Sequence, residues 1–203
     1  MAHRHTRREG VYNFILETAK DLANKKLGAL FIIAPKRKFK NLYEPLYPQV
    51  IGNHSISESG AKELILKLAE LDGAFLIGDD GTLVAFGARI EKSKALKGYG
   101  TKHAAATGIT FHIKNSTAIL VSEETNWIKV FKKGNIVLRM DSSKTPKPVM
   151  HKVVTFLTDN DTTLLATAGV TAAIVGFLPV VVVSGTYIAI KTATGVIKKS
   201  FRT

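Results

Sequence analysis

Three short polar groups in the middle of the sequence combine residue types that suit a phosphorylated ligand and a metal ion. In the first group, Asp72 stands beside Gly73, where a residue without a side chain lets a ligand approach the backbone closely. In the second, Gly100 and Thr101 open a predicted helix as an N-cap pair that turns free amides toward an anion. The third group, residues 122–125, adds carboxylates at the end of a predicted strand.

The composition limits the chemistry that these groups can perform. Cysteine is absent, which excludes a disulfide framework and thiolate chemistry and fits a reducing compartment. The net charge of +13 predicts attraction to polyanions, whether nucleotide phosphates, nucleic acid or anionic lipid. The first residues are basic and polar with no apolar core directly after them, so we expect no signal peptide.

Predicted helices and strands alternate around the polar groups. The continuous apolar run at residues 28–34 predicts a strand buried on both faces, at the centre of a sheet. Helical periodicity covers residues 57–69, with Ser57 or Ser59 as the candidate N-cap. Because hairpins and crossovers both occur, we expect an α/β fold with a mixed central β-sheet flanked by helices. The other predicted helices cover residues 9–26 and 101–110, and the other strands cover residues 74–77, 82–90, 116–122, 127–131 and 136–139.

Two charged segments have more than one interpretation. Residues 36–48 are basic and interleaved with aromatic side chains, which is typical of a single-stranded nucleic-acid contact, although we favour a solvated loop. Asp79 and Asp80 lie between two glycines and between two apolar runs. This pattern predicts a hairpin, so we interpret both acids as turn residues rather than metal ligands.

The character of the sequence changes after residue 140. Residues 141–148 have the composition of a linker, so we expect a nucleotide-binding domain at residues 1–145 and a linker with an apolar segment at residues 146–203. Residues 162–190 carry no charge and exceed the roughly 20 residues that cross a bilayer, which predicts a membrane anchor. The alternative is a pair of β-prone strands, at residues 180–183 and 187–190, that covers the sheet.

Four motifs in order along the chain resemble the diadenylate cyclase domain. They are Gly28-Ala29-Leu30, Asp72-Gly73-Ala74, Gly100-Thr101-Lys102-His103 and Val121-Ser122-Glu123-Glu124-Thr125, and the resemblance covers about residues 10–141. It implies condensation of two ATP molecules into cyclic di-AMP and two pyrophosphates, with Mn or Mg as the divalent metal. It also implies that two domains of a homodimer or higher homo-oligomer meet face to face. The ribose 3′-hydroxyl of one ATP then attacks the α-phosphate of the other.

The resemblance implies a role for each candidate site residue. Asp72 and Glu124 would ligate the metal as hard oxygen donors. Glu123 should point to the opposite face of its strand and matter less. Arg89 and Ile90 match the position where the family lays its adenine. The catalytic candidates are Asp72, Gly73 and His103, and the nucleotide-binding candidates are Ala74, Arg89, Ile90, Gly100, Thr101, Lys102 and Ser122.

The predicted phosphate-binding helix departs from the family pattern. Bacterial members carry Arg-His-Arg where this chain has Lys102, His103 and Ala104. A lysine still neutralises phosphate but lacks the bidentate fork of arginine, and Ala104 supplies no charge. In this respect the chain looks closer to archaeal members.

A second class of function is compatible with the same features. The excess of lysine and arginine and the missing second arginine fit a basic, membrane-associated protein that binds a nucleotide or nucleic acid without catalysis. For the cyclase, we expect a cytoplasmic catalytic domain, membrane contact through residues 162–190 and no specific nucleic-acid partner.

Overall fold

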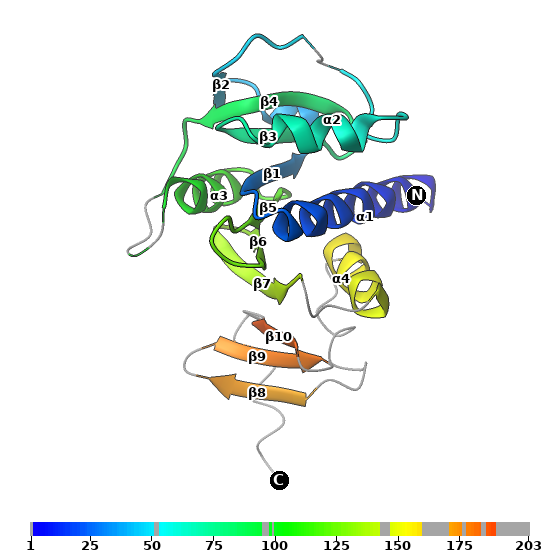
Figure 1. The fold of residues 1–203 in the computed structure, drawn as a ribbon, viewed down its shortest axis with the longest axis vertical. Helices are drawn as coiled ribbons and strands as arrows, with labels where there is room; N and C mark the ends of the chain where they lie inside the picture. The colour runs from blue at the N-terminus through cyan, green and yellow to red at the C-terminus, as the bar shows by residue number, and fades with distance from the viewer. Residues whose placement is uncertain are drawn as a thin grey trace.

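The computed structural model describes residues 2–50, 53–94, 98, 100–142, 147–159, 171–175, 178–183 and 186–189. They form a mixed seven-stranded sheet with helices on both faces, and a separate three-stranded sheet (Figure 1). The expected α/β class with a mixed central sheet is therefore confirmed. The helices are α1 (Ala2–Asn24), α2 (Ala61–Leu68), α3 (Thr101–His112) and α4 (Lys147–Asp159), with a 3-10 turn at Lys36–Lys38. The strands of the large sheet are β1 (Ala29–Ala34), β2 (Tyr43–Pro45), β3 (Ala74–Gly78), β4 (Leu83–Ile90), β5 (Thr117–Val121), β6 (Trp127–Lys132) and β7 (Asn135–Asp141).

Strand β1 lies at the centre of the large sheet, as its apolar run predicts. The strand order is β2-β4-β3-β1-β5-β6-β7, and β1 runs parallel to β3 and antiparallel to β5. Phe31 packs in one core cluster with residues of α1, α2 and α4, whereas Ile32 packs in a second cluster with residues of α3. We call these the α1-face and α3-face clusters. Because successive side chains point to opposite faces, a strand covered on both faces requires a continuous apolar run.

Strands β3 and β4 form the expected hairpin. In its turn, the Asp80 carboxylate accepts a hydrogen bond from the backbone amide of Thr82 at 3.1 Å and lies 3.0 Å from the ammonium of Lys36. These contacts hold the turn to the neighbouring chain. The interpretation of Asp80 as a turn residue is therefore confirmed.

The start of α2 differs from the expected one. The helix follows Gly60, which has a φ of +81° and provides no side-chain cap. The hydroxyl of Ser57 instead lies 2.7 Å from that of Ser55, and Ser59 is not the cap either. The predicted caps are therefore wrong, and the helix begins later than expected, at Ala61.

Helix α4 is an element that the sequence interpretation missed. Residues 143–146 lie outside the described part of the chain, and the helix begins at Lys147, inside the expected linker. Val153, Val154 and Leu157 are buried in the α1-face cluster. The ammonium of Lys132 donates to the carbonyl oxygen of Leu157 at 2.9 Å, which joins α4 to β6. Helix α4 therefore contributes to the same core as α1.

The described part of the apolar C-terminal run consists of strands. They are β8 (Thr171–Val175), β9 (Leu178–Val183) and β10 (Thr186–Ala189), paired antiparallel in the order β10-β9-β8. Strands at these positions agree with the β-strand alternative, although they form their own sheet. Among the described residues, no helix has the length and apolarity needed to cross a membrane. The remainder of residues 162–190 lies outside the described chain.

Candidate functional site

The strand registers bring the sequence motifs to one end of the large sheet. Leu30 of β1 pairs in parallel with Ala74 of β3, so these two strands begin together. Ala29 pairs with Val121 at the end of β5, and Ala74 pairs with Ala88 near the end of β4. The residues that precede β1 and β3 and those that follow β5 are therefore neighbours at this end. We call it the motif end; it carries Gly28, Asp72, Gly73, Arg89, Ile90 and residues 122–125.

The first turn of α3 reaches the motif end through Lys102. A Cβ atom on Gly28 would lie 3.4 Å from Nζ of Lys102 and 3.3 Å from Oε2 of Glu123. Gly28 therefore leaves room for a cation from the helix and an anion from the loop after β5. The expected orientation of Glu123 away from the site is wrong, because the residue lies in a bend beyond β5, where strand alternation no longer applies.

The helix start itself agrees in part with the predicted N-cap pair. Gly100 is the N-cap and Thr101 is the first helical residue, and neither Gly100 nor its surroundings provide a side-chain cap. A Cβ atom on Gly100 would meet no atom of the described residues within 4 Å apart from its chain neighbours, so in the described part of the chain the helix start is open. Uncapped first-turn amides beside open space can accept an anionic ligand.

Gly73 is required by the fold as well as by its motif. It has a φ of +106°, and a Cβ atom there would lie 2.4 Å from the carbonyl carbon of Gly87. Gly87, with a φ of +54°, has equally little room beside Tyr47. This pair of glycines lets the backbone just before β3 lie in close contact with the backbone of β4, its antiparallel neighbour. It fixes the backbone of Asp72, whose side chain is exposed at the motif end.

His103 is held by the sheet beneath α3. Its Nε2 lies 2.9 Å from Nζ of Lys129 on β6, and its ring packs edge-on against Phe131, with the ring centroids 5.9 Å apart. Burial, then the charges of Lys129 and Arg139, lower the pKa of His103 from 6.5 to about 4. The imidazole is therefore neutral near pH 7. Its Nε2 accepts a hydrogen bond from the Lys129 ammonium, which leaves Nδ1–H as the donor.

Lys129 and Arg139 are residues of this region that the sequence interpretation missed. They face each other across β6 and β7. Burial, and then the charge of Arg139, lower the pKa of Lys129. The available signal was a lysine at an alternating position inside the apolar strand Trp127–Lys132.

Two other candidates occupy the end of β4. Arg89 is exposed and forms an ion pair with Glu44 of β2, whereas Ile90 is 8% exposed and packs in the α3-face cluster. The adjoining strand β2 pairs with them through Tyr43 and Glu44. Their predicted contact with adenine stays a prediction.

The predicted metal ligands are two separate carboxylates. Asp72 precedes β3 and Glu124 follows β5, and since β1 lies between these strands, the strands themselves are about 10 Å apart. Among the described residues, His, Asp and Glu side chains form no cluster of three or more that could hold a metal ion. Exposed carboxylates of this kind fit an ion that also takes water and substrate phosphate oxygens, as magnesium commonly does. They do not form a cage of protein ligands alone.

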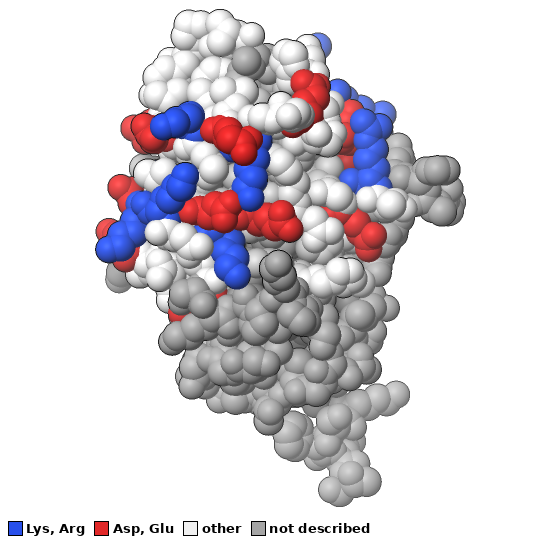
Figure 2. Space-filling view, turned by 45° about the vertical axis from the view of Figure 1, so that its right-hand side comes forward, with Lys and Arg blue, Asp and Glu red and all other residues white. Residues whose placement is uncertain are grey.

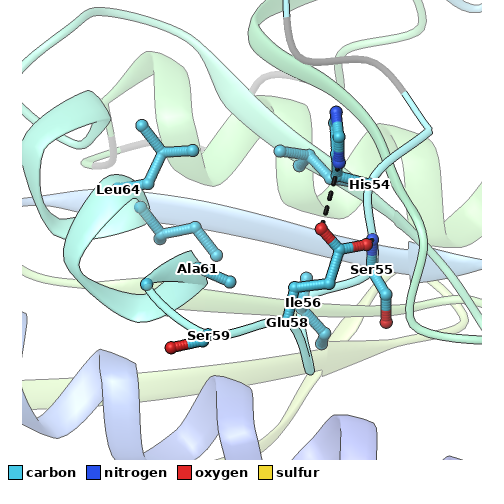
Figure 3. Close-up of a pocket in the computed structure, with 10 residues that line it drawn as sticks. His54, Ser55, Ile56, Glu58, Ser59, Ala61 and Leu64 are labelled. Atoms are coloured by element: carbon cyan, nitrogen blue, oxygen red, sulfur yellow. Dashed lines mark hydrogen bonds and ion pairs between the residues drawn. The ribbon is translucent and has the colours of Figure 1, made fainter.

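A pocket of about 210 Å³ lies at the other end of the sheet (Figure 3). It is lined by the loop before α2, by α2 itself and by Leu83, the first residue of β4. In the loop, Glu58 accepts hydrogen bonds from the amide of Ser55 at 2.8 Å and from Nδ1 of His54 at 3.0 Å. The motif residues are therefore not in this pocket.

The surface charge is mixed on the face that Figure 2 displays, where lysines and arginines are interleaved with acidic side chains. Ion pairs of the described residues include that of Lys62 on α2 with Asp21 on α1, at 2.6 Å. The described residues on this face form no continuous basic patch.

Comparisons with known proteins identify the family of this chain. Residues 16–136 match the family model DAC, described as DisA bacterial checkpoint controller nucleotide-binding. The chain is 34% identical over 143 residues to a diadenylate cyclase of Haloferax volcanii, covering 65% of this chain and 53% of the relative. It is 32% identical over 120 residues to a diadenylate cyclase of Methanocaldococcus jannaschii, covering 57% of this chain and 38% of the relative. The chain thus spans about half the length of these curated relatives, or less.

Solved structures with a similar fold include a double cysteine mutant of DacA from Staphylococcus aureus. The two chains are 21% identical with a TM-score of 0.49, and the similarity covers 72% of this chain and 93% of DacA. A hypothetical membrane spanning protein from Bacillus cereus has the same identity of 21% and TM-score of 0.49, covering 61% of this chain and 60% of that one. The family model covers more than half of the chain, and the chain therefore belongs to the DAC family of nucleotide-binding domains.

Proposed function

We propose that this protein is a diadenylate cyclase that condenses two ATP molecules into cyclic di-AMP and two pyrophosphates. The observation that carries the proposal is the gathering of Asp72, Lys102 and the loop after β5 at the motif end of a DAC-family sheet. The diadenylate cyclases of two archaea, to which the chain is about one-third identical, support the same reaction.

The reaction forms two bonds, one from the ribose 3′-oxygen of each ATP to the α-phosphorus of the other. At each α-phosphorus the bond to the pyrophosphate oxygen breaks, one pyrophosphate leaves, and the proton of the attacking hydroxyl passes to solvent. Asp72 polarises the attacking hydroxyl, on a backbone fixed by the contact of Gly73 with Gly87. Lys102, Thr101 and the open amides of α3 hold the phosphates.

A divalent ion, Mn or Mg, would be held by Asp72 and Glu124 and would neutralise charge on the phosphates. Neutral His103 donates from Nδ1 and orients Lys129 through Nε2. Ser122, Ala74, Arg89 and Ile90 line the nucleotide site in this proposal.

Two protomers are needed, since each holds a single ATP. Activity per chain should therefore rise with protein concentration in the dilute range, as dimers form. Measuring specific activity alongside the mass from light scattering checks this requirement. Constant specific activity from a demonstrated monomer contradicts it.

The direct test is incubation of the full chain with ATP and Mn, followed by chromatography for cyclic di-AMP. The expected product accumulates with time and depends on the metal. A well-folded chain that consumes no ATP under any tested metal contradicts the proposal.

One observation favours a second candidate, a nucleotide-binding protein without catalysis. The phosphate-binding helix has Ala104 where bacterial members carry an arginine, so it holds less charge for the developing transition state. Tight ATP binding without product, at saturating metal and protein concentration, would support this candidate.

A further inference from the structure

A row of paired residues crosses the large sheet close to the motif end. Leu30 of β1 pairs with Leu120 of β5, which pairs with Lys129 of β6, which pairs with Arg139 of β7. Directly paired residues point to the same face of a sheet. Leu30 and Leu120 pack in the α3-face cluster, so Lys129 and Arg139 lie on the face that α3 covers.

The two cations lie under the first turn of α3. Lys129 contacts His103, the third residue of that helix, at 2.9 Å. The same turn carries Lys102 and the uncapped amides that follow Gly100. The first turn of α3 and the two sheet cations, Lys129 and Arg139, therefore lie close together near the motif end.

Like charges directly opposite each other in a sheet are destabilising, and partial burial adds to this effect. Burial and the charge of Arg139 both lower the pKa of Lys129, in agreement with this effect. His103 is neutral near pH 7 and brings no compensating charge. In the described part of the chain, the acids near these cations include Asp141, two residues beyond Arg139 on the same face of β7, and exposed Glu123 beside Lys102. A polyanion bound beside these two cations and the first turn of α3 would offset the repulsion between them.

We propose that Lys129 and Arg139 bind the triphosphate of the nucleotide and supply, from the sheet, the cationic contact that α3 lacks at Ala104. His103 is a positioning residue, because its neutral Nε2 accepts the hydrogen bond that orients Lys129. The inference rests on the proposed function and specifies how this chain holds phosphate.

The test compares Lys129→Gln and Arg139→Gln with Lys133→Gln in the full chain. Lys133 is an exposed residue at the turn after β6, so its variant removes the same charge from the opposite end of the hairpin. Calorimetry measures binding of an ATP analogue with a non-hydrolysable α,β linkage, of inorganic tripolyphosphate and of adenosine. Loss of a charge-assisted hydrogen bond should weaken binding of the analogue and of tripolyphosphate about tenfold or more, with adenosine unchanged.

Two further readouts exclude a merely structural role. Lys129→Gln should raise or preserve the thermal midpoint of the free protein, since it relieves repulsion with Arg139, while Lys129→Arg should restore most of the affinity. Analogue affinities of both variants within twofold of Lys133→Gln overturn the inference, as does a wild-type chain that binds no tripolyphosphate.

The outcome is separable from that of the proposed function. If the wild-type chain makes no cyclic di-AMP but loses polyphosphate affinity in these variants, the inference stands and the cyclase proposal fails. If it makes cyclic di-AMP and the variants bind and turn over ATP as Lys133→Gln does, the inference alone fails.

Discussion

The ammonium of Lys129 on β6 donates a hydrogen bond of 2.9 Å to Nε2 of His103 on α3, so the predicted phosphate-binding helix is tied to the sheet beneath it. This contact changes the role expected for His103. A neutral imidazole that already accepts a hydrogen bond cannot act as a second cation for phosphate. It keeps one donor, at Nδ1.

The pH dependence of stability follows from this contact. The folded-state pKa of His103 is about 4, against 6.5 for the exposed side chain, because burial and the neighbouring cations oppose protonation. The unfolded chain therefore takes up this proton first, and the free energy of unfolding falls as the pH drops from 6.5 toward 4. In His103→Gln this contribution is absent, so denaturant titrations across that window should give a shallower fall. Parallel curves for the two proteins would contradict the assigned environment of His103.

Asp72→Asn should abolish cyclic dinucleotide synthesis while the fold stays intact. A neutral amide ligates a hard divalent cation poorly and polarises a hydroxyl less than a carboxylate does. The control is Asp79→Asn, which makes the same chemical change in the β3–β4 turn at the other end of the sheet. Product formation and the thermal midpoint are compared for both variants, and normal turnover by Asp72→Asn removes this residue from the site.

Gly73→Ala should destabilise the protein by about 2 kcal/mol or more, because the added methyl overlaps backbone atoms that cannot rotate away and the φ is unfavourable for alanine. The closest of these atoms is the carbonyl carbon of Gly87, at 2.4 Å. Gly10→Ala is the matched control, since a Cβ atom at that position of α1 meets nothing within 4 Å. It should be neutral or stabilising by up to about 1 kcal/mol through helix propensity. Chemical denaturation measures the free energy of unfolding of both variants. Equal stability of the two variants would refute the close backbone contact between Gly73 and Gly87.

The packing of α4 predicts how far the folded domain extends. A chain ending at residue 149 loses Val153, Val154 and Leu157 from the α1-face cluster and uncovers apolar surface worth on the order of 25 cal/mol per Å². A chain ending at residue 159 keeps them. We expect the longer chain to be soluble and the shorter one to melt earlier or aggregate. The measurement is the solubility and the thermal midpoint of each truncated chain, compared with those of the full chain. Equal midpoints for the two truncated chains would show that α4 adds nothing to the core and would favour the boundary predicted at residue 145.

Elements governed by local pattern could be predicted from the sequence. The apolar run of β1 identified a central strand because both of its faces are covered, and the Asp-Gly turn identified the β3–β4 hairpin. The residues of the motif end were also identifiable by type and by their resemblance to a family, before any register was known. Their roles in binding and catalysis stay predictions.

Features that depend on tertiary contacts could not be predicted in this way. The pairing of Lys129 with Arg139 follows from a strand register, which single-strand periodicity does not fix. Helix α4 begins among lysines and prolines that read as a linker, although proline is well tolerated in the first turn of a helix. The predicted N-cap of α2 was wrong because the hydroxyls of Ser55 and Ser57 form a hydrogen bond with each other. Serine can bond to several nearby groups, and the sequence does not determine which one it takes.

The measurement that tests the central claim most directly is the stoichiometry of products from ATP. Phosphorus NMR of the full chain with ATP and Mg resolves the α-phosphate of ATP, pyrophosphate and the phosphodiester of cyclic di-AMP in one experiment. The account predicts two pyrophosphates released for each cyclic di-AMP formed, with no ADP. With Asp72→Asn, the ATP signal should stay constant and neither pyrophosphate nor cyclic di-AMP should appear. Release of ADP and phosphate, or unchanged ATP from a folded dimer that binds it, would contradict the assignment of this chain as a diadenylate cyclase.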